Sequence, residues 1–521
     1  MRTQPAETIG PERADRAETS RLGEAIGTLL PALERFNRYE GSDPAARNRK
    51  VWHDQLDQPL PVHGGGLDEV LGELAEVVIP HGLRNGAPGF NGWVTTAPTT
   101  AGAAASLAAT VAGSQRWWLQ PFNYLESVSL RWLAELLGIP PSWQGTFTAG
   151  GSSANLVALG AARQHAFERL GRDPARTGLS GQAVRIYAST EVHHVITRAA
   201  AVLGLGREAV VGIPVDDGSR IELDELRRAL EADRSAGIVP VALVATAGTV
   251  NTGAVDPIGA MADLAAEFGS WLHVDGAYGL FGRLDERIAP LYEGLERADS
   301  AVVDPHKWLA APVGIGAVFV RDRSLLGRAF TLEPAAYLEG AVEESQAEIG
   351  SPFDSFGELF HDFNLDQSAP SRGAVVWAIL REIGADGIRQ RVRRHNDFAR
   401  RLADIVVADE RLELLAAPTL SICCFRYRAQ GMDDAGLDRL NAEIAHRLRA
   451  ETRYVPSTTR VAGRFAIRPC YINPRTTETE VDGLARSVRE IGDQIVGESE
   501  PRESSLWPTG DQQSQKGAAG P

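Results

Sequence analysis

The sequence has few cysteines, no excess of basic residues and no long apolar run. Lys and Arg total 53 against 68 Asp and Glu, which gives the chain a net charge of −15. Binding to nucleic-acid phosphates requires clustered basic side chains, so this balance argues against a nucleic-acid partner. The stretch closest to a membrane span, residues 101–112, consists of small residues interrupted by Gly, Ser and Thr. We therefore expect no membrane anchor.

The N-terminus and the cysteines point to the cytoplasm. Residues 1–20 are polar and of mixed charge, without the apolar core of a secretory signal peptide. The three cysteines, Cys423, Cys424 and Cys470, are odd in number and lack metal-ligand spacing. Buried free thiols in a reducing compartment are the simplest interpretation. We expect a cytoplasmic protein without a metal site.

The length and composition predict more than one structural unit. At 521 residues the chain is too long for one ordinary domain, and we expect two or three units. Hydrophobic residues make up 43% and charged residues 23%, which are ordinary values for globular proteins, so a sizeable core can form. The first twenty residues and the Gly/Ser/Gln/Pro-rich tail, residues 499–521, are expected to be disordered.

From Thr146 onward, short apolar runs alternate with segments of helical periodicity. The runs predict buried strands, and the intervening segments predict helices. The predicted strands are 184–188, 241–246, 271–274 and 316–320, and the helices are 155–170, 223–230 and 257–268, with earlier helices at 67–78 and 127–137. This alternation is typical of an α/β fold with a mostly parallel central sheet covered by helices. Ligands of such sheets bind at the carboxyl ends of the strands.

After about residue 330 the pattern changes. Residues 332–371 are acidic, polar and aromatic with little periodicity, which predicts a mobile loop region. The segments that follow predict a smaller C-terminal α+β domain, with helices at 372–402, 437–448 and 480–496 and strand-like runs at 412–427 and 464–472.

Four short segments that carry reactive or small residues come just after predicted strands or at helix starts. They are Thr148-Ala-Gly-Gly-Ser-Ser-Ala-Asn155, Ser189-Thr-Glu-Val-His-His194, His273-Val-Asp-Gly-Ala-Tyr278 and Asp304-Pro-His-Lys-Trp308. Each segment alone is weak evidence. All four in this order are a specific combination.

Lys307 and Asp275 are the two candidates for the central chemistry. Lys307 follows an apolar run and is flanked by His306 and Trp308. Apolar surroundings favour the neutral amine, which is the form that makes an imine with an aldehyde. Asp275 ends an apolar strand, where its carboxylate could hold the pyridine nitrogen of pyridoxal 5′-phosphate (PLP) protonated. The alternatives are a surface lysine between two core residues and an aspartate that caps a turn.

Other members of the four segments are candidates for cofactor contacts. Gly151 and Ser152 lie in a Gly/Ser run before a helix, where backbone amides and hydroxyls can bind a phosphate, although the same run is also a good helix cap. His193 could stack on the cofactor ring or serve a structural role. Thr246, at the end of a strand, could bond the ring or the substrate, or merely start a turn. Ala277 is small enough to let a ring pack closely.

Together these segments resemble the group II PLP-dependent amino-acid decarboxylases, the fold type I family that includes aromatic-amino-acid, tyrosine, histidine and glutamate decarboxylases. The Pro-His-Lys-Trp, His-Val-Asp-x-Ala-Tyr, histidine and Gly/Ser elements occur in the family's order. The resemblance runs from about Pro88 to Thr477 and includes Phe90-Asn-Gly-Trp-Val-Thr95. It implies PLP as the cofactor and an amino acid as the small-molecule substrate.

The resemblance assigns a role to each matching position. It implies that Lys307 holds the cofactor covalently, that Asp275 pairs with the pyridine nitrogen, and that His193 and Ala277 contact the two faces of the ring. Thr246 matches the family's threonine near the ring. The implied phosphate contacts are Gly151, Ser152, Ser300 and His306.

The resemblance also implies a homodimer with active sites at the interface. The expected organisation is an N-terminal segment, residues 1–100, that packs on the partner subunit, and a large PLP-binding domain, residues 101–345. A small domain, residues 346–498, follows.

Tyr337 is the candidate proton donor to Cα. Many family members carry a tyrosine on a mobile loop some thirty residues past the lysine, and the similar stretch here is Glu333-Pro-Ala-Ala-Tyr337-Leu338. A loop aromatic packed on the core is the alternative, and a histidine near the ring is a second possible donor. In this family a phenylalanine at that position accompanies aldehyde formation, so a tyrosine favours simple decarboxylation.

The sequence departs from the family pattern at three places. Asp304 replaces the usual asparagine before Pro-His-Lys, and a carboxylate near a phosphate must turn away or be compensated. Residues 120–126, Gln-Pro-Phe-Asn-Tyr-Leu-Glu, add aromatic bulk near the expected substrate entrance. Arg372 keeps the first member of the family's arginine pair, which could meet a substrate carboxylate or be solvated, and Gly373 replaces the second.

Aromatic residues at the expected substrate pocket favour an apolar or aromatic amino acid. The predicted substrate contacts are Phe90, Trp93 and Phe122, with Trp117, Trp118 and Tyr124 nearby. A core or dimer-interface role for these residues, and an acidic substrate, both stay open. We therefore expect decarboxylation of an L-amino acid to its amine and CO₂. The alternatives are aldehyde synthesis or another carbon–carbon lysis on the same scaffold, and a non-catalytic PLP-binding protein.

Overall fold

The computed structural model describes residues 20–38, 41, 49–113, 121–179, 181–331 and 360–499. Three expectations lie largely or wholly outside these residues. They are the disordered ends, the aromatic pair Trp117 and Trp118, and the part of the predicted loop that carries Tyr337.

A seven-stranded sheet forms the centre of the molecule, with strand order β2-β8-β7-β6-β5-β3-β4. The four predicted strands are confirmed, and three more join them. The bounds are β2 (Gln144–Thr148), β3 (Val184–Ser189), β4 (Val210–Ile213), β5 (Val239–Thr246), β6 (Trp271–Asp275), β7 (Ser300–Val303) and β8 (Gly316–Val320). The strands from β7 to β4 are parallel, and β8 runs antiparallel to both of its neighbours. The mostly parallel α/β prediction is confirmed.

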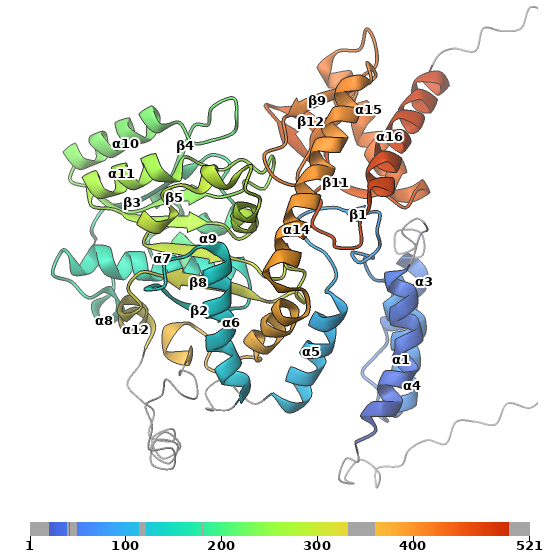
Figure 1. The fold of residues 1–521 in the computed structure, drawn as a ribbon, viewed down its shortest axis with the longest axis horizontal. Helices are drawn as coiled ribbons and strands as arrows, with labels where there is room; N and C mark the ends of the chain where they lie inside the picture. The colour runs from blue at the N-terminus through green and yellow to red at the C-terminus, as the bar shows by residue number, and fades with distance from the viewer. Residues whose placement is uncertain are drawn as a thin grey trace, which may run out of the picture.

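Helices cover both faces of this sheet (Figure 1). One face packs on α7 (Gly151–Glu168), α9 (Val195–Val202) and α12 (Ser324–Phe330). The other face packs on α6 (Pro121–Leu137), α10 (Leu223–Ser235) and α11 (Ile258–Phe268). Successive strand residues point to opposite faces, so Leu243 joins one core and Val244 the other. The central strands are therefore apolar throughout.

A second sheet has the order β1-β11-β12-β10-β9 and packs on three long helices. Its members are β1 (Phe90–Asn91), β9 (Leu412–Ala416), β10 (Cys424–Tyr427), β11 (Val455–Val461) and β12 (Arg464–Arg468), with α14 (Arg372–Ala408), α15 (Asp434–Glu451) and α16 (Glu478–Ser499). The predicted C-terminal helices and strands are thus present. Strand β1 pairs in parallel with β11, so the chain near residue 90 belongs to this second sheet.

The N-terminal helices stand apart from the two sheets (Figure 1). They are α1 (Leu22–Asn37), α3 (Arg49–Leu56) and α4 (Leu67–Glu73), the last continued by a π-helical turn, η2 (Leu74–Val78). Their element contacts are chiefly with one another. Helix α5 (Thr100–Ala112) then leads into the large sheet region through residues outside the described part. Within the described residues, no helix combines the length and apolar character needed to cross a bilayer.

Short elements complete the described chain. They are η3 (Ile79–His81), α8 (Pro174–Thr177), η4 (Arg207–Ala209), η5 (Gly279–Leu284), η6 (Ala289–Tyr292), η7 (Leu295–Arg297) and η9 (Phe360–Phe363). Phe360 is 1% exposed, so the described end of the predicted loop region packs into the protein core.

Candidate active site

The carboxyl ends of β5, β6 and β7 open onto a cavity of about 280 Å³. Parallel strands end at the same edge of a sheet, which is why residues far apart in sequence meet there. Members of all four sequence segments line the cavity, namely Gly150, Gly151, Ser152, Asn155, His193, Thr246, Asp275, Ala277, Tyr278, Asp304, His306 and Lys307.

Lys307 lies in the loop after β7, next to a carboxylate. Its Nζ is 3.0 Å from Asp304 Oδ2, and its backbone N–H donates to the Asp304 carbonyl. The Lys307 side chain is 22% exposed and that of Asp304 only 2% exposed. The lysine was expected in an entirely apolar setting, and this expectation is wrong. The turn brings the carboxylate of Asp304, three residues earlier in the chain, back to the Lys307 side chain. The compensation expected for Asp304 is present, and Lys307 supplies it.

Asp275 is the last residue of β6, and its carboxylate is held in place by two donors. The Ala277 N–H donates to Oδ1 at 3.2 Å, and Asn155 Nδ2 donates to Oδ2 at 3.4 Å. The residue is 6% exposed, yet it lines the cavity. These contacts leave lone pairs of the carboxylate available to a group bound in the cavity.

The Gly/Ser run forms a turn that leads directly into α7. Gly150 has φ +125°, a backbone conformation that residues other than glycine rarely adopt. A Cβ on Gly151 would lie 2.7 Å from Asp304 Oδ2 and 3.2 Å from Ala277 Cβ, so only glycine leaves this space open. Ser152 is exposed in the first turn of the helix. The start of α7 is thus a cradle suited to an anion.

His193 and Thr246 complete the wall of the cavity. His193 precedes α9, and its Nδ1 accepts from the Val195 N–H at 3.2 Å. Burial lowers the pKa of His193, and neighbouring His194 lowers it further, so the ring is neutral near pH 7. Thr246 donates its backbone N–H to Asp256 Oδ2 at 2.8 Å. Its hydroxyl is buried and has no partner among the described residues, which leaves it free for a bound group.

The structure places Ser300 away from the cavity and His306 on its wall. Ser300 is the first residue of β7, at the end of the strand away from the cavity, and its hydroxyl is fully buried against Trp271 Nε1 and His273 Nδ1, both at 2.8 Å. It cannot bind a phosphate at the cavity. His306 lines the cavity, with Nδ1 donating to the Ile315 carbonyl at 2.7 Å.

A family profile matches most of the chain. The family described as "Pyridoxal-dependent decarboxylase conserved domain" covers residues 51–428. The chain belongs to the pyridoxal-dependent decarboxylase family. The predicted resemblance is thereby confirmed, and with it PLP as the cofactor and amino-acid decarboxylation as the reaction class.

Individual relatives of this decarboxylase are similar over nearly their whole length. The chain is 29% identical over 459 residues to an aromatic-L-amino-acid decarboxylase of Bacillus atrophaeus, and the match covers 85% of this chain and 89% of the relative. It is 31% identical over 455 residues to an L-2,4-diaminobutyrate decarboxylase of Rhizobium meliloti (strain 1021), covering 84% and 85%. The crystal structure of Oryza sativa TDC with PLP and tryptamine matches with TM-score 0.81 and 25% identity, covering 92% of this chain and 100% of that one. The fold type I prediction is confirmed.

The cavity of this decarboxylase fits PLP on three independent observations. A lysine amine, which can bind the aldehyde of PLP, and a strand-end carboxylate, which can pair with its pyridine nitrogen, line the same cavity. The glycine cradle at Gly150 and Gly151 leaves room for an anion at the start of α7. The buried hydroxyl of Thr246 lacks a protein partner among the described residues, as expected for a group that a ligand satisfies.

The three predicted substrate residues have different positions in the decarboxylase. Phe90 is 1% exposed within β1 and does not line the cavity of its own chain, so the structure does not place it at the predicted substrate contact. Phe122 is half-buried on α6 and does not line the cavity within one chain. Trp93 is 47% exposed and holds φ +49°, an unfavourable conformation for a bulky residue.

Arg468 ties Trp93 to the mouth of the cavity, a connection that sequence reasoning missed. Arg468 is 3% exposed and donates from Nη1 to the Trp93 carbonyl at 2.9 Å. Its other nitrogens donate to the carbonyls of Val250 and Asn251. Because Val250 lines the cavity, the backbone of Trp93 is held beside its rim. No local sequence signal links these three segments.

The arginine pair of the family has a structural explanation here. Arg372 is 7% exposed, and its Nε donates to the carbonyl of Gly314, a residue that lines the cavity. Arg372 is therefore not solvated. Gly373, which replaces the second arginine, lies where a Cβ would be only 2.6 Å from the backbone nitrogen of Glu126. The close approach of α14 to α6 excludes any side chain at position 373.

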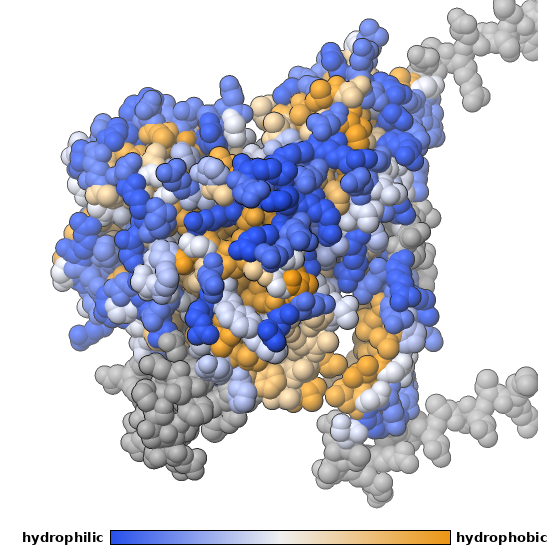
Figure 2. All heavy atoms as spheres, viewed as in Figure 1, coloured by the Kyte–Doolittle hydropathy of each residue, from blue (hydrophilic) through white to orange (hydrophobic). Residues whose placement is uncertain are grey.

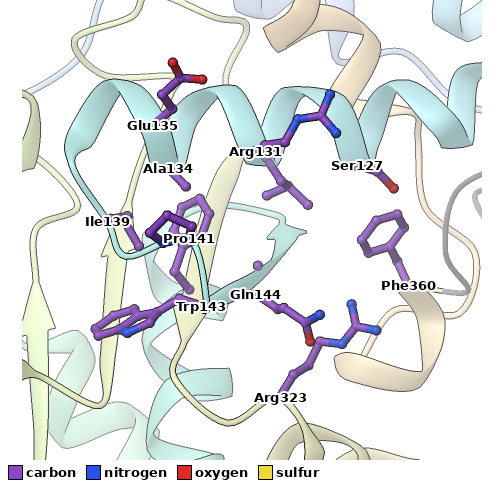
Figure 3. A pocket seen from close by; sticks show the side chains of 13 residues that line it. Ser127, Arg131, Ala134, Glu135, Ile139, Pro141, Trp143, Gln144, Arg323 and Phe360 are labelled. Atoms are coloured by element: carbon purple, nitrogen blue, oxygen red, sulfur yellow. The ribbon is translucent and has the colours of Figure 1, made fainter. Parts of the chain in front are cut away.

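A second cavity, of about 510 Å³, lies at the opposite edge of the sheet and contains none of the predicted site residues (Figure 3). Trp143 and Ile139 lie on one side of it, with Arg323 and Phe360 on the other. Gln144 at the start of β2 and Phe319 near the end of antiparallel β8 place it far along the strands from Lys307. It is therefore separate from the PLP site.

Proposed function

We propose that this protein removes the carboxylate of an aromatic L-amino acid and releases the corresponding amine. The observation that carries the proposal is the meeting of Lys307, Asp275, His193 and Thr246 in one cavity, with Trp93 tied to its rim. The aromatic-L-amino-acid decarboxylase relative and the tryptamine-bound TDC structure support the aromatic substrate.

Lys307 would hold PLP covalently through the cofactor's aldehyde carbon. To form this bond, the Lys307 side chain must first separate from Asp304, because an ammonium group held in an ion pair at 3.0 Å is not a nucleophile. Gly151, Ser152 and His306 are proposed to hold the phosphate at the start of α7. PLP, when bound, supplies an electron-accepting ring for the bond that breaks at Cα.

Asp275 is proposed to keep the pyridine nitrogen protonated, since its fixed carboxylate faces the cavity. His193 and Ala277 are proposed to contact the two faces of the ring. A neutral His193 with Nδ1 accepting from the Val195 N–H carries its proton on Nε2, so this atom is able to donate toward substrate. Tyr337 stays the predicted donor of the proton returned to Cα, with His193 as the alternative, and it lies outside the described residues.

Thr246 and Trp93 are proposed to orient the substrate. The free hydroxyl of Thr246 can donate to a carboxylate or a ring substituent in the cavity. The indole of Trp93 is partly exposed, with Phe90 and Arg449 against it, and aromatic pairs are favourable beyond the area they bury. Phe122 is proposed to reach the substrate from the partner subunit, because it does not line the cavity of its own chain.

We also propose a homodimer in the cytoplasm. Helix α1 exposes an apolar stripe at helical spacing, formed by Leu22, Ile26, Leu30 and Leu33, each between 36% and 48% exposed. Apolar residues gather over the N-terminal helices and α5 (Figure 2). Monomeric proteins rarely leave such a stripe uncovered. Three buried, unpaired cysteines support a reducing compartment.

The experiment that tests the substrate is an amino-acid panel assayed for CO₂ and amine with the purified full-length protein. The panel contains tryptophan, tyrosine, phenylalanine, glutamate and L-2,4-diaminobutyrate, with hydrogen peroxide and ammonia measured in parallel. We expect the highest kcat/KM with an aromatic substrate and no peroxide. Preference for diaminobutyrate or glutamate would overturn the aromatic assignment, and stoichiometric peroxide would identify an aldehyde synthase instead.

Trp93→Ala sharpens this test. Loss of one large apolar contact is expected to lower kcat/KM for the aromatic substrate by about tenfold to a hundredfold. Leu365→Ala is a matched control, because Leu365 is also an exposed large apolar residue and does not line the cavity. Equal effects of the two substitutions would show that Trp93 does not contact the substrate.

A further inference from the structure

A chain of buried polar residues leads from Asp275 into the protein interior and begins with Asn155, which also lines the cavity. Asn155 Nδ2 is 3.4 Å from Asp275 Oδ2, and Asn155 Oδ1 is 2.7 Å from His273 Nε2. His273 Nδ1 is 2.8 Å from Ser300 Oγ, which is 2.8 Å from Trp271 Nε1. Four side chains from β6, β7 and α7 are thus joined in series to one carboxylate.

The partners fix the direction of every hydrogen bond in the series. An indole N–H only donates, so Trp271 donates to Ser300 Oγ. Burial lowers the pKa of His273 to about 4, so its ring is neutral and carries one proton. The carbonyl oxygen of Asn155 only accepts, which places that proton on Nε2 of His273. Nδ1 therefore accepts from the Ser300 hydroxyl, and the Asn155 amide donates to Asp275.

All donors in the series point toward Asp275, and water has no access to them. Asn155 is 1% exposed, and both His273 and Ser300 are completely buried. Hydrogen bonds in series polarise one another in a low-dielectric interior, so the last donor in such a chain is stronger than an isolated amide. Asn155 is also fixed by a second hydrogen bond, from Nδ2 to the Gly151 carbonyl at 2.9 Å.

We propose that Asn155, His273 and Ser300 are positioning residues that hold the Asp275 carboxylate correctly turned toward the pyridine nitrogen. The inference rests on the proposed role of Asp275. The same Asn155 amide also donates to the carbonyl of Gly151, which belongs to the glycine cradle at the start of α7. One amide therefore aligns the carboxylate that meets the ring and the turn that meets the phosphate.

The test compares the affinities of full-length protein for PLP and for deaza-PLP, in which carbon replaces the ring nitrogen. Only PLP can use Asp275, so the ratio of the two dissociation constants reports on that contact alone. We expect His273→Phe, which keeps the ring volume but removes both nitrogens, to lower the wild-type preference for PLP by about fivefold to tenfold. Its affinity for deaza-PLP is expected to stay within about twofold of wild type, since that ligand cannot meet Asp275 and the hydrogen bond from Asn155 to Gly151 at the phosphate turn is kept.

A second variant separates positioning from packing. In His273→Gln the side-chain amide can still donate to Asn155 Oδ1, so the preference for PLP is expected to recover to within about threefold of wild type. Ser300→Ala, one step farther from Asp275, is expected to give a smaller loss than His273→Phe. Circular dichroism and thermal unfolding of each variant identify any that fail to fold, and His273→Gln then provides the comparison.

The outcomes distinguish this inference from the proposed role of Asp275 itself. A wild-type protein that binds PLP and deaza-PLP equally would overturn the pyridine contact and the series with it. A wild-type preference that survives His273→Phe unchanged would overturn the series alone. Equal losses for both ligands in His273→Phe would also overturn it, because a general packing defect does not distinguish a ring nitrogen from a carbon.

Discussion

Asp304→Asn is expected to tighten the binding of PLP. The substitution replaces a carboxylate with an amide of nearly the same size, at a residue that is 1% exposed. In the free protein Asp304 forms the ion pair with Lys307, and covalent attachment of the cofactor must break it. The same carboxylate lies beside the glycine cradle, since a Cβ on Gly151 would be 2.7 Å from Oδ2. Asp304 therefore opposes PLP binding in two ways.

The magnitude follows from the 3.0 Å separation of Lys307 Nζ and Asp304 Oδ2. Coulomb's law gives about 5 to 6 kcal/mol for two unit charges at this distance with an effective dielectric constant of 20. Desolvation offsets much of this attraction, and the Lys307 side chain, 22% exposed, keeps some access to water. A net gain of about 1.5 to 3 kcal/mol is expected, which is about tenfold to a hundredfold in Kd.

The assay is titration of cofactor-free protein with PLP, followed by absorbance, in wild type and Asp304→Asn. Pyridoxal, which lacks the phosphate, separates the two contributions, because only the release of Lys307 affects its binding. Asp263→Asn makes the same change in net charge at an exposed ion pair and is the matched control. Unchanged or weaker PLP binding in Asp304→Asn would refute the reasoning.

Two further predictions concern the stability of the fold. Gly373→Ala is expected to cost about 1 to 3 kcal/mol in denaturant unfolding, because its Cβ would meet the backbone of Glu126 at 2.6 Å, whereas Gly72→Ala, with open space around it, should cost nothing. Burial lowers the pKa of His273 to about 4 and that of His395 well below its usual value, while both protonate near pH 6.5 when unfolded. The unfolded chain therefore binds more protons below pH 6.5, and lowering the pH from 6.5 to 5 should remove about 1.5 kcal/mol of stability through His273, with a further loss through His395. His395→Gln should remove that further loss in urea titrations, and a flat profile in wild type would contradict the prediction.

The core of the site could be predicted because its residues occur at strand ends. Lys307, Asp275, His193 and Thr246 each follow an apolar run, and the carboxyl ends of parallel strands necessarily meet at one edge. The same logic predicted the central sheet, since strands buried on both faces are apolar throughout. Their catalytic and cofactor roles stay predictions that the proposed variants test.

Two predicted contacts do not line the cavity, because proximity in sequence indicates neither which end of a strand a residue occupies nor how deeply it is buried. Ser300 lies only seven residues before Lys307, yet β7 spans the distance between them and leaves Ser300 on the far side. Phe90 belongs to a motif near the expected substrate entrance, but the pairing of β1 with β11 buries its ring.

Other features could not be predicted because they join segments distant in sequence. Arg468 links Trp93 to Val250 through hydrogen bonds that span more than two hundred residues. The position of Asp304 beside Lys307 depends on a turn whose geometry the motif does not reveal. Asn155 and His273 were present in the motifs, but their contact exists only once α7 packs on β6.

The most direct test of the account is to reduce the purified protein with borohydride and map the modified peptide by mass spectrometry. The account predicts one pyridoxyl phosphate group per chain, attached to the side chain of Lys307, and none in Lys307→Ala. Attachment to another lysine, or no attachment after incubation with excess PLP, would contradict it.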